Sequence, residues 1–301
     1  MELFAPVPDG WVVDATLGGA GHSRAILDAH PGLGIIGLDQ DDTAIDAATA
    51  ALDGYGSRVL IRHVRFDRLA EVLAELNVRE VSGVLFDLGV SSPQLDRGER
   101  GFSFRNDGPL DMRMDRRSAT SADDIVNHYS AQRLAETLDR YGDERFARRI
   151  ANAIVDARPI SSTAELAEVV ATAIPAPARR KSTGHPARRT FQAIRIEVND
   201  ELAVLATAID QAIDALTPGG RMVAMSYHSG EDRLVKERFR QAVSGGCECP
   251  PRLPCVCGAV SRGRIVSRGA QKASEQEIID NPRASSVRLR VFEKHEESKA
   301  S

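Results

Sequence analysis

The stretch Val12-Val-Asp-Ala-Thr-Leu-Gly-Gly-Ala-Gly-His-Ser23 is the strongest indication of the fold in this chain. An apolar strand end carries Asp14, a glycine-rich turn follows at once, and a helical pattern begins at Ser23. Glycines in such a turn reach positive φ and bring a ligand close to main-chain N–H groups. The stretch therefore predicts a strand, a turn and a helix that together bind a nucleotide-like cofactor, with a purely structural turn as the alternative.

The spacing of this turn indicates which cofactor it binds. A dinucleotide fingerprint G-x-G-x-x-G that starts at Gly19 requires glycine at position 24, where Arg24 stands. Asp14 precedes the first glycine, Gly18, and its carboxylate can face a cationic group. This arrangement favours S-adenosylmethionine (SAM), which carries a sulfonium and an ammonium, over NAD.

The first third of the chain alternates strand-like and helix-like segments, which is typical of parallel βαβ units. We expect strands at residues 11–15, 34–39, 58–64 and 81–87, and helices at residues 23–29, 42–52 and 67–76. Three of these strands end at Asp14, Asp39 and Asp87, and ligands of open α/β sheets bind outside the carboxyl ends of the strands.

Each of these strand ends has an expected role in binding an adenosyl ligand. Asp39 is positioned to bind the two hydroxyls of a ribose. Phe66 can stack on an adenine ring beside the carboxylate of Asp67, or it is simply a core aromatic residue. Acids gathered at one edge of the sheet repel one another unless a cation lies among them, which is the stronger reason to expect SAM.

The rhythm of the sequence changes after Asp87. Residues 88–117 resemble a long loop, residues 118–175 are helical only, and a long helix is expected over residues 190–216 before a turn at residues 217–220. Strands return at residues 221–227 and 287–292, with a helix to about residue 243 between them. We interpret the chain as a Rossmann-like α/β domain with a mostly parallel sheet, residues 1–112 and 198–301, interrupted by an all-helical insertion, residues 113–197.

Composition bounds the class of protein. The 301 residues carry a net charge of −4, so the surface as a whole is not basic. No apolar run approaches the roughly 18 residues of a membrane span, and no signal peptide is visible, so we expect a cytoplasmic protein without membrane contact. The sequence leaves the oligomeric state open, with a homodimer as one alternative.

Cations are concentrated in one segment. The stretch from Ala178 to Ile196 holds six cations and no acid, and the cations, with a histidine among them, are Arg179, Arg180, Lys181, His185, Arg188, Arg189 and Arg195. A solvated surface is one interpretation. Contacts with RNA phosphates are the other, and the lack of counter-charges favours it.

Eight runs of sequence together resemble one family. They start at Asp14 (through Ser23), Asp87 (through Asp96), Arg100 (through Phe104), Asp107 (through Asp115), His185 (through Gln192), Asn199 (through Leu202), Ser226 (through Arg233) and Asn281 (through Ala284). In this order, over nearly the whole chain, they resemble the bacterial 16S ribosomal RNA (cytosine-N4) methyltransferases, also called RsmH or MraW.

The resemblance implies a fold, a substrate and a set of site residues. It implies a class I SAM-dependent methyltransferase core with an inserted helical domain for RNA recognition. The implied substrate is the exocyclic N4 amine of a cytidine in the decoding region of 16S rRNA, within the small ribosomal subunit. The SAM contacts of the family fall here on Ala20, Gly21, His22, Asp39, Phe66, Asp87 and Gln94.

The sequence also departs from the family. The family has a further segment before the position of Glu2, so we expect a late start codon or a truncation here. Tyr227 stands where the family often has Phe, and Gly230 stands where Leu is typical.

Methyl transfer to a cytosine amine needs no metal, but an acceptor for an N4–H bond favours it. Candidates for this acceptor are Asp111, Ser92 and His228. Asp111 alternates with Arg113, so a structural Asp–Arg pair is an equally good interpretation. His228 follows the expected fifth strand and is as often a structural residue.

The cysteines leave three interpretations open. Cys247, Cys249, Cys255 and Cys257 form two Cys-x-Cys pairs around a proline-rich link. They hold a structural zinc ion, stay reduced, or, less favoured in the cytosol, form a disulfide.

Three other functions remain alternatives to the rRNA methyltransferase. The first is an aminomethyltransferase that acts on DNA or tRNA. The second is a non-enzymatic RNA-binding assembly factor, which has no need to keep Asp14, Asp39 and Asp87. The third is an NAD oxidoreductase, which calorimetry with SAM and NAD distinguishes.

Overall fold

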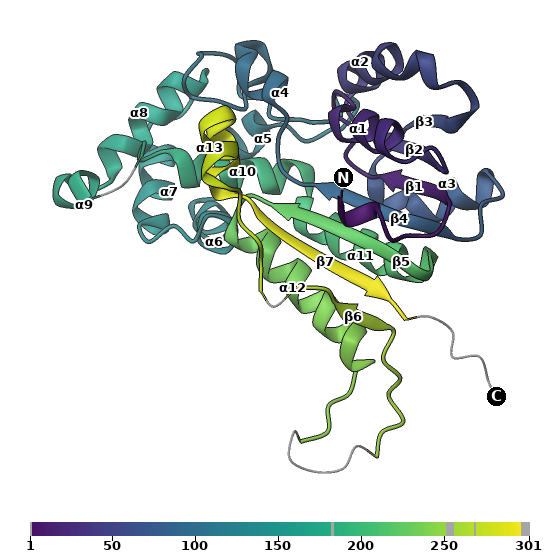
Figure 1. Ribbon diagram of the computed structural model, residues 1–301. Helices are drawn as coiled ribbons and strands as arrows, with labels where there is room; N and C mark the ends of the chain where they lie inside the picture. The colour runs from purple at the N-terminus through teal and green to yellow at the C-terminus, as the bar shows by residue number, and fades with distance from the viewer. Residues whose placement is uncertain (1, 182–183, 251–255, 268, 296–301) are drawn as a thin grey trace. The chain divides into compact units, whose positions relative to one another are not determined.

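Two compact units make up the chain in the computed structural model (Figure 1), which describes residues 2–181, 184–250, 256–267 and 269–295. The first unit joins Met1–Gly89 to Leu202–Ser301, and the second is Val90–Glu201. The expected insertion of residues 113–197 falls within the second unit. The edges of that unit lie further out because Phe102 and Leu110 pack into its helical core.

A seven-stranded sheet of order β3-β2-β1-β4-β5-β7-β6 forms the first unit. Its strands are β1 (Gly10–Asp14), β2 (Leu33–Asp39), β3 (Val59–His63), β4 (Val81–Asp87), β5 (Leu216–Ser226), β6 (Gly263–Ile265) and β7 (Arg288–Lys294). Strands β1 to β5 pair in parallel, whereas β7 runs antiparallel to β5 and β6. The mostly parallel, Rossmann-like sheet expected from the sequence is therefore confirmed.

Helices cover both faces of this sheet. The helices of the unit are η1 (Glu2–Phe4), α1 (Gly21–Ala29), α2 (Asp42–Leu52), η2 (Asp53–Arg58), η3 (Phe66–Arg68), α3 (Leu69–Glu75), α11 (Glu201–Ala215, from Leu202 on), α12 (Ser229–Ser244), α13 (Glu275–Asp280) and η5 (Pro282–Ser286). Val13 and Val84 share one apolar cluster with residues of α3, α11 and α12. Their neighbours on the same strands, Val12 and Leu85, point to the opposite face of the sheet. There they pack with residues of η1, α1 and α2.

The expected turn at residues 217–220 is instead part of β5. Val81 pairs with Leu216 and Gly83 with Arg221, so the intervening residues form an irregularity in the ladder. Gly219 adopts a φ of 77° there, which glycine reaches without strain. The residues expected to form a turn therefore form the irregularity, and β5 begins before them at Leu216.

The single long helix expected over residues 190–216 is wrong. The structure has α10 (Arg188–Asn199) and α11, separated by Asp200 in the left-handed conformation at φ 51°. The side-chain amide of Asn199 donates to the carbonyls of Met112 and Arg195, and its oxygen accepts from the Met114 amide. Apolar spacing continues across the break, so periodicity alone could not reveal it.

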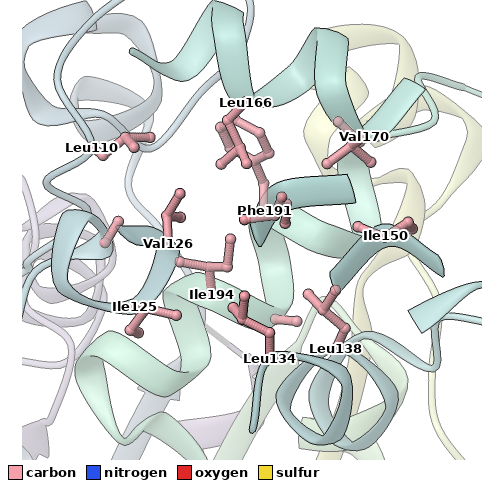
Figure 2. Packing of buried hydrophobic residues seen from close by; sticks show 14 of the residues in the cluster. Leu110, Ile125, Val126, Leu134, Leu138, Ile150, Leu166, Val170, Phe191 and Ile194 are labelled. Carbon is pink, nitrogen blue, oxygen red and sulfur yellow. The ribbon is translucent and has the colours of Figure 1, made fainter. Parts of the chain in front are cut away.

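The second unit is helical, as expected. Its helices are α4 (Ser92–Asp96), η4 (Gly98–Arg100), α5 (Ala122–His128), α6 (Ala131–Gly142), α7 (Ala147–Asp156), α8 (Thr163–Ala173), α9 (Ala176–Lys181) and α10. Ser121 caps α5 in a capping box with Asp124. Figure 2 shows the core, in which Leu134, Ile150 and Ile194 are completely buried.

Among the residues that the structure describes, no helix combines the length and the apolar character needed to cross a bilayer.

Candidate functional site

Three carboxylates lie at the carboxyl ends of neighbouring strands. Asp14 ends β1, Asp39 ends β2 and Asp87 ends β4, and β1 pairs in parallel with both of the other strands. The strand order reverses between β1 and β4, and such a switch point is where open α/β sheets bind ligands. The parallel pairing thus brings together the acids that the sequence places far apart.

The glycine-rich turn leads from β1 to α1 and leaves its backbone accessible. Gly18 and Ala20 adopt positive φ values of 50° and 60°. A Cβ added at Gly19 or Gly21 would meet no atom within 4 Å, so open space lies in front of both residues. Helix α1 begins at Gly21 without a side-chain cap, so its first turn presents N–H groups and the positive end of the helix dipole.

Asp39 fixes this turn. Its Oδ2 accepts a hydrogen bond from the Gly18 amide over 2.8 Å, and its Oδ1 accepts one from the Asp41 amide over 2.9 Å. Burial raises the pKa of Asp39, and these amide donors oppose the rise. Each carboxylate oxygen has two acceptor sites, so Asp39 keeps capacity for the hydroxyls of a ribose.

Asp14 is a buried carboxylate held by two local donors. The Ser23 hydroxyl donates to its Oδ2 over 2.6 Å, and the Thr16 amide donates to its Oδ1 over 3.2 Å. Burial raises the pKa of Asp14 from 3.8 to about 6, against the opposing effects of Ser23 and of His22. A buried acid with so perturbed a pKa at a strand end is typical of a functional site.

Asp87 is half-buried and lies between two side chains of the same unit. The Tyr227 hydroxyl donates to its Oδ1 over 2.8 Å, and His22 Nε2 lies 3.3 Å from its Oδ2. The hydrogen bond to Asp87 is the main cause that raises the pKa of His22, against a smaller opposing effect of burial. His22 therefore supplies part of the positive charge that these gathered acids require.

Tyr227 is a site residue that the sequence reasoning missed. Burial, followed by the negative charge of Asp87, raises the pKa of Tyr227, so its hydroxyl keeps the proton that it donates. The only signal in the sequence was its departure from the Phe of the resembling family.

Phe66 lies at the end of β3, as expected, and opens η3. Its ring packs edge-on against Phe86, with centroids 5.7 Å apart, but Phe66 is only partly buried. Arg65 holds both oxygens of the Asp67 carboxylate, at 2.9 and 2.7 Å. Phe66 thus has both the packing expected of a core residue and an exposed part.

His228 is the N-cap of α12. Its Nδ1 accepts hydrogen bonds from the amides of Gly230 and Glu231, and its Nε2 lies 3.1 Å from Glu231 Oε1. A Cβ at residue 230 would come within 3.1 Å of the His228 ring, so glycine allows this close cap. These contacts favour the structural interpretation of His228.

The other candidates belong to the helical unit. Ser92 is the exposed first residue of α4, and Gln94 completes the capping box of that helix with Ser91. Arg113 engages both oxygens of Asp111, at 2.7 and 3.2 Å, and bonds the carbonyl of Ser118 over 2.9 Å. The structural Asp–Arg pair that the sequence left open is therefore present.

The basic residues also lie in the helical unit. Arg179, Arg180 and Lys181 are at the end of α9, and Arg188 and Arg189 are exposed at the start of α10. His185, also exposed, stacks on Phe104 with a centroid distance of 4.3 Å. Arg189 bonds the carbonyl of Asp143 over 2.9 Å, and Arg195, the sixth cation of the stretch, pairs with Glu201 over 2.8 Å. No ion pair is recorded within the described ranges for the other four cations.

Comparison with known proteins gives the family. A model of the MraW methylase family matches residues 1–295. The chain is similar to a protein of Kocuria rhizophila named ribosomal RNA small subunit methyltransferase H. The two are 46% identical over an alignment of 310 positions, which covers 99% of this chain and 92% of the relative. Proteins of the same name from Mycobacterium tuberculosis H37Rv and Frankia casuarinae are 50% and 52% identical, over 98% and 94% of this chain and 78% and 89% of the relatives. With a family match that runs through both units, the chain belongs to the MraW methylase family.

Proposed function

We propose that the protein transfers the methyl group of SAM to the exocyclic N4 of a cytidine in the decoding region of 16S rRNA, within the small ribosomal subunit. Family membership and the names of the relatives support a methyltransferase that acts on this RNA. The observation that carries the proposal is the trio of acids at adjacent strand ends around an open glycine turn. A ribosomal substrate implies that the reaction takes place in the cytoplasm.

The residues at the strand ends fit SAM. The accessible backbone at Gly19 and Gly21 and the uncapped start of α1 suit the carboxylate of its methionyl part. The residues of the sheet unit that would hold SAM are Ala20, Gly21, His22, Asp39, Phe66 and Asp87. When bound, SAM supplies an electrophilic methyl group on a positive sulfur.

The acids have separate parts in this binding. Asp39 accepts hydrogen bonds from ribose hydroxyls with the acceptor sites that Gly18 and Asp41 leave available. Asp87 attracts the cationic end of SAM, and Tyr227 keeps the Asp87 carboxylate oriented toward it. Asp14 adds negative charge at the end of β1, between their strands, because at neutral pH it is ionised despite its raised pKa.

The helical unit is proposed to bind the RNA. Arg179, Arg180, Lys181 and Arg188 are cations suited to phosphate contacts, and His185 adds an aromatic face. A cytosine amine inside a duplex cannot reach a methyl group at the edge of a sheet, so the target base must be unpaired or turned out. This requirement favours a distorted or single-stranded site in folded RNA.

Ser92 is the best of the three candidates to accept an N4–H hydrogen bond. Arg113 donates three hydrogen bonds to the Asp111 carboxylate, which leaves about one acceptor site, and His228 Nδ1 is bonded to backbone amides. Ser92 is exposed, and no partner of its hydroxyl is recorded in the described part of the chain. Its oxygen can therefore orient the amine while the proton released after transfer passes to water.

The test is mass analysis of rRNA nucleosides after incubation of purified small subunits with the protein and isotopically labelled SAM. We expect N4-methylated cytidine in the decoding region, and none in DNA or tRNA treated in the same way. Label in DNA or tRNA alone would favour the alternative aminomethyltransferase. RNA binding without any transfer of label would favour a non-enzymatic assembly factor.

A further inference from the structure

A cysteine-containing loop connects α12 to β6, and backbone contacts close its base. Gly245 ends α12 in the left-handed conformation, and the Arg262 amide donates to the Ala242 carbonyl over 2.9 Å. A Cβ at Gly245 would lie 2.2 Å from the Val260 oxygen. The outgoing and returning arms of the loop therefore touch where the loop begins.

Apolar burial does not hold the loop beyond this base. Val256 and Val260 are 88% and 76% exposed, although valine is among the residues most often buried. In the described part of the loop, Gly246 and Gly258 have positive φ, and a Cβ added at either would meet no atom within 4 Å. Apolar packing therefore does not fix the two arms relative to each other.

Three thiols meet between the two arms. Cys247 and Cys249 lie on the outgoing arm and Cys257 on the returning arm, and their sulfur atoms all lie within 4.8 Å of one another. The structure shows all three as reduced cysteines. Thiolates bound to tetrahedral zinc at about 2.3 Å are roughly 3.8 Å apart, so a small inward movement of the sulfurs would bring all three to bonding distance from one ion.

We propose that Cys247, Cys249 and Cys257 bind a structural zinc ion. Each thiol releases its proton to solvent as its sulfur bonds to the ion, so three Zn–S bonds replace three S–H bonds. The ion links the two arms and supplies the constraint that the exposed valines do not. Cys255 lies outside the described residues, and the proposal stands on the other three.

The first experiment measures metal in the full chain, purified in reducing buffer without a metal-affinity tag. We expect a single zinc ion per chain by mass spectrometry of the metal. Exchange with cobalt should give the intense visible absorption of a tetrahedral thiolate site. A reduced protein that holds no zinc and takes up no cobalt overturns the proposal, as does recovery of these cysteines as a disulfide from protein kept free of oxygen.

Variants assign the ligands. The double variant Cys247→Ser/Cys257→Ser should bind zinc at least about a hundredfold more weakly, because removing even a group that only orients a ligand weakens metal binding ~10–100-fold. The control Val256→Ser changes the neighbour of Cys257, keeps every thiol and should retain zinc. Zinc retained by the double variant contradicts the proposal.

SAM affinity, measured on the same samples, separates this site from the proposed function. It should be equal in the wild type and both variants, which also shows that the sheet unit is folded. Failure of methyl transfer to rRNA would leave the zinc result unaffected. Absence of zinc would likewise leave the proposed methyl transfer unaffected.

Discussion

The Tyr227 hydroxyl donates a hydrogen bond to Asp87 Oδ1 over 2.8 Å and so joins the end of β5 to the end of β4. The two residues are 140 positions apart in sequence. Their contact, with His22 on the other carboxylate oxygen, fixes the orientation of Asp87 before any ligand arrives. Such preorganised acids bind a cationic ligand without the free-energy cost of ordering a side chain.

The first prediction concerns this hydrogen bond. Tyr227→Phe keeps the ring and removes the donor, so the free energy of unfolding should fall by about 1 kcal/mol. Urea denaturation measures the change, and Tyr227→Ala, which also loses ring packing, should destabilise the protein more. Equal stability of the Phe variant and the wild type would show that the contact contributes nothing.

Asp39 should contribute directly to SAM affinity. Asp39→Ala should weaken SAM binding by about 1–3 kcal/mol, because charge-assisted hydrogen bonds to the ribose are lost. Isothermal titration calorimetry measures the loss. Asp42→Ala, an exposed acid three residues further on, serves as the matched control. An unchanged affinity in the Asp39 variant would refute the ribose role.

Asp14 should lower the stability of the ligand-free protein at neutral pH. Its pKa is 3.8 in the unfolded chain and about 6 in the folded protein. Between these values the folded protein keeps a proton that the unfolded chain has lost, so stability falls as the pH rises through this window. Asp14→Asn should therefore be about 1–3 kcal/mol more stable than the wild type at pH 7.

Urea denaturation at two pH values checks this prediction. The advantage of the Asn variant should disappear near pH 4, where Asp14 is largely protonated in the folded protein and about half protonated in the unfolded chain. An advantage that is the same at both pH values would point to packing rather than charge.

SAM affinity should rise with pH. Because the pKa of His22 is raised, its imidazolium persists beside Asp87 at pH values above the ordinary histidine pKa of 6.5. This cation competes with SAM for the carboxylate. As the pH rises through that pKa, His22 loses its charge, while Asp14 has already ionised and Tyr227 stays protonated. Binding should therefore be tighter at about pH 8 than at about pH 6.

Histidine variants identify the group responsible. His22→Gln should flatten the rise and leave only the contribution of Asp14 at the acidic end. His30→Gln, at the opposite end of α1, should keep the wild-type profile. A rise that survives unchanged in His22→Gln would exclude the competition.

The basic residues of α9 should act by neutralising phosphates. The triple variant Arg179→Ala/Arg180→Ala/Lys181→Ala should bind rRNA more weakly. The logarithm of its binding constant should also fall less steeply with the logarithm of the salt concentration. The slope should be smaller by about 2, at roughly 0.7 for each phosphate that is no longer neutralised. Lys236→Ala/Arg240→Ala removes exposed cations of α12 and should keep the wild-type slope. Filter binding across salt concentrations compares them, with SAM affinity as the check on folding.

Sequence patterns alone predicted six of the seven strands and the acids at their ends, but not the short β6 or the strand order. The observed bounds of α2 and β4 coincide with the predicted ones, and Asp14, Asp39 and Asp87 end their strands as expected. These features are local: apolar runs, caps and glycine turns encode each βαβ unit, and parallel pairing then aligns the strand ends.

Which side chains meet could be established only from the folded chain. It placed Tyr227 and His22 on Asp87, made His228 the cap of α12, and gathered thiols from both arms of one loop. It also broke the expected long helix at Asp200, because Asn199 bonds to the backbone of a distant segment. Contacts between residues far apart in the chain depend on how the elements pack, and no local pattern of residues encodes that packing.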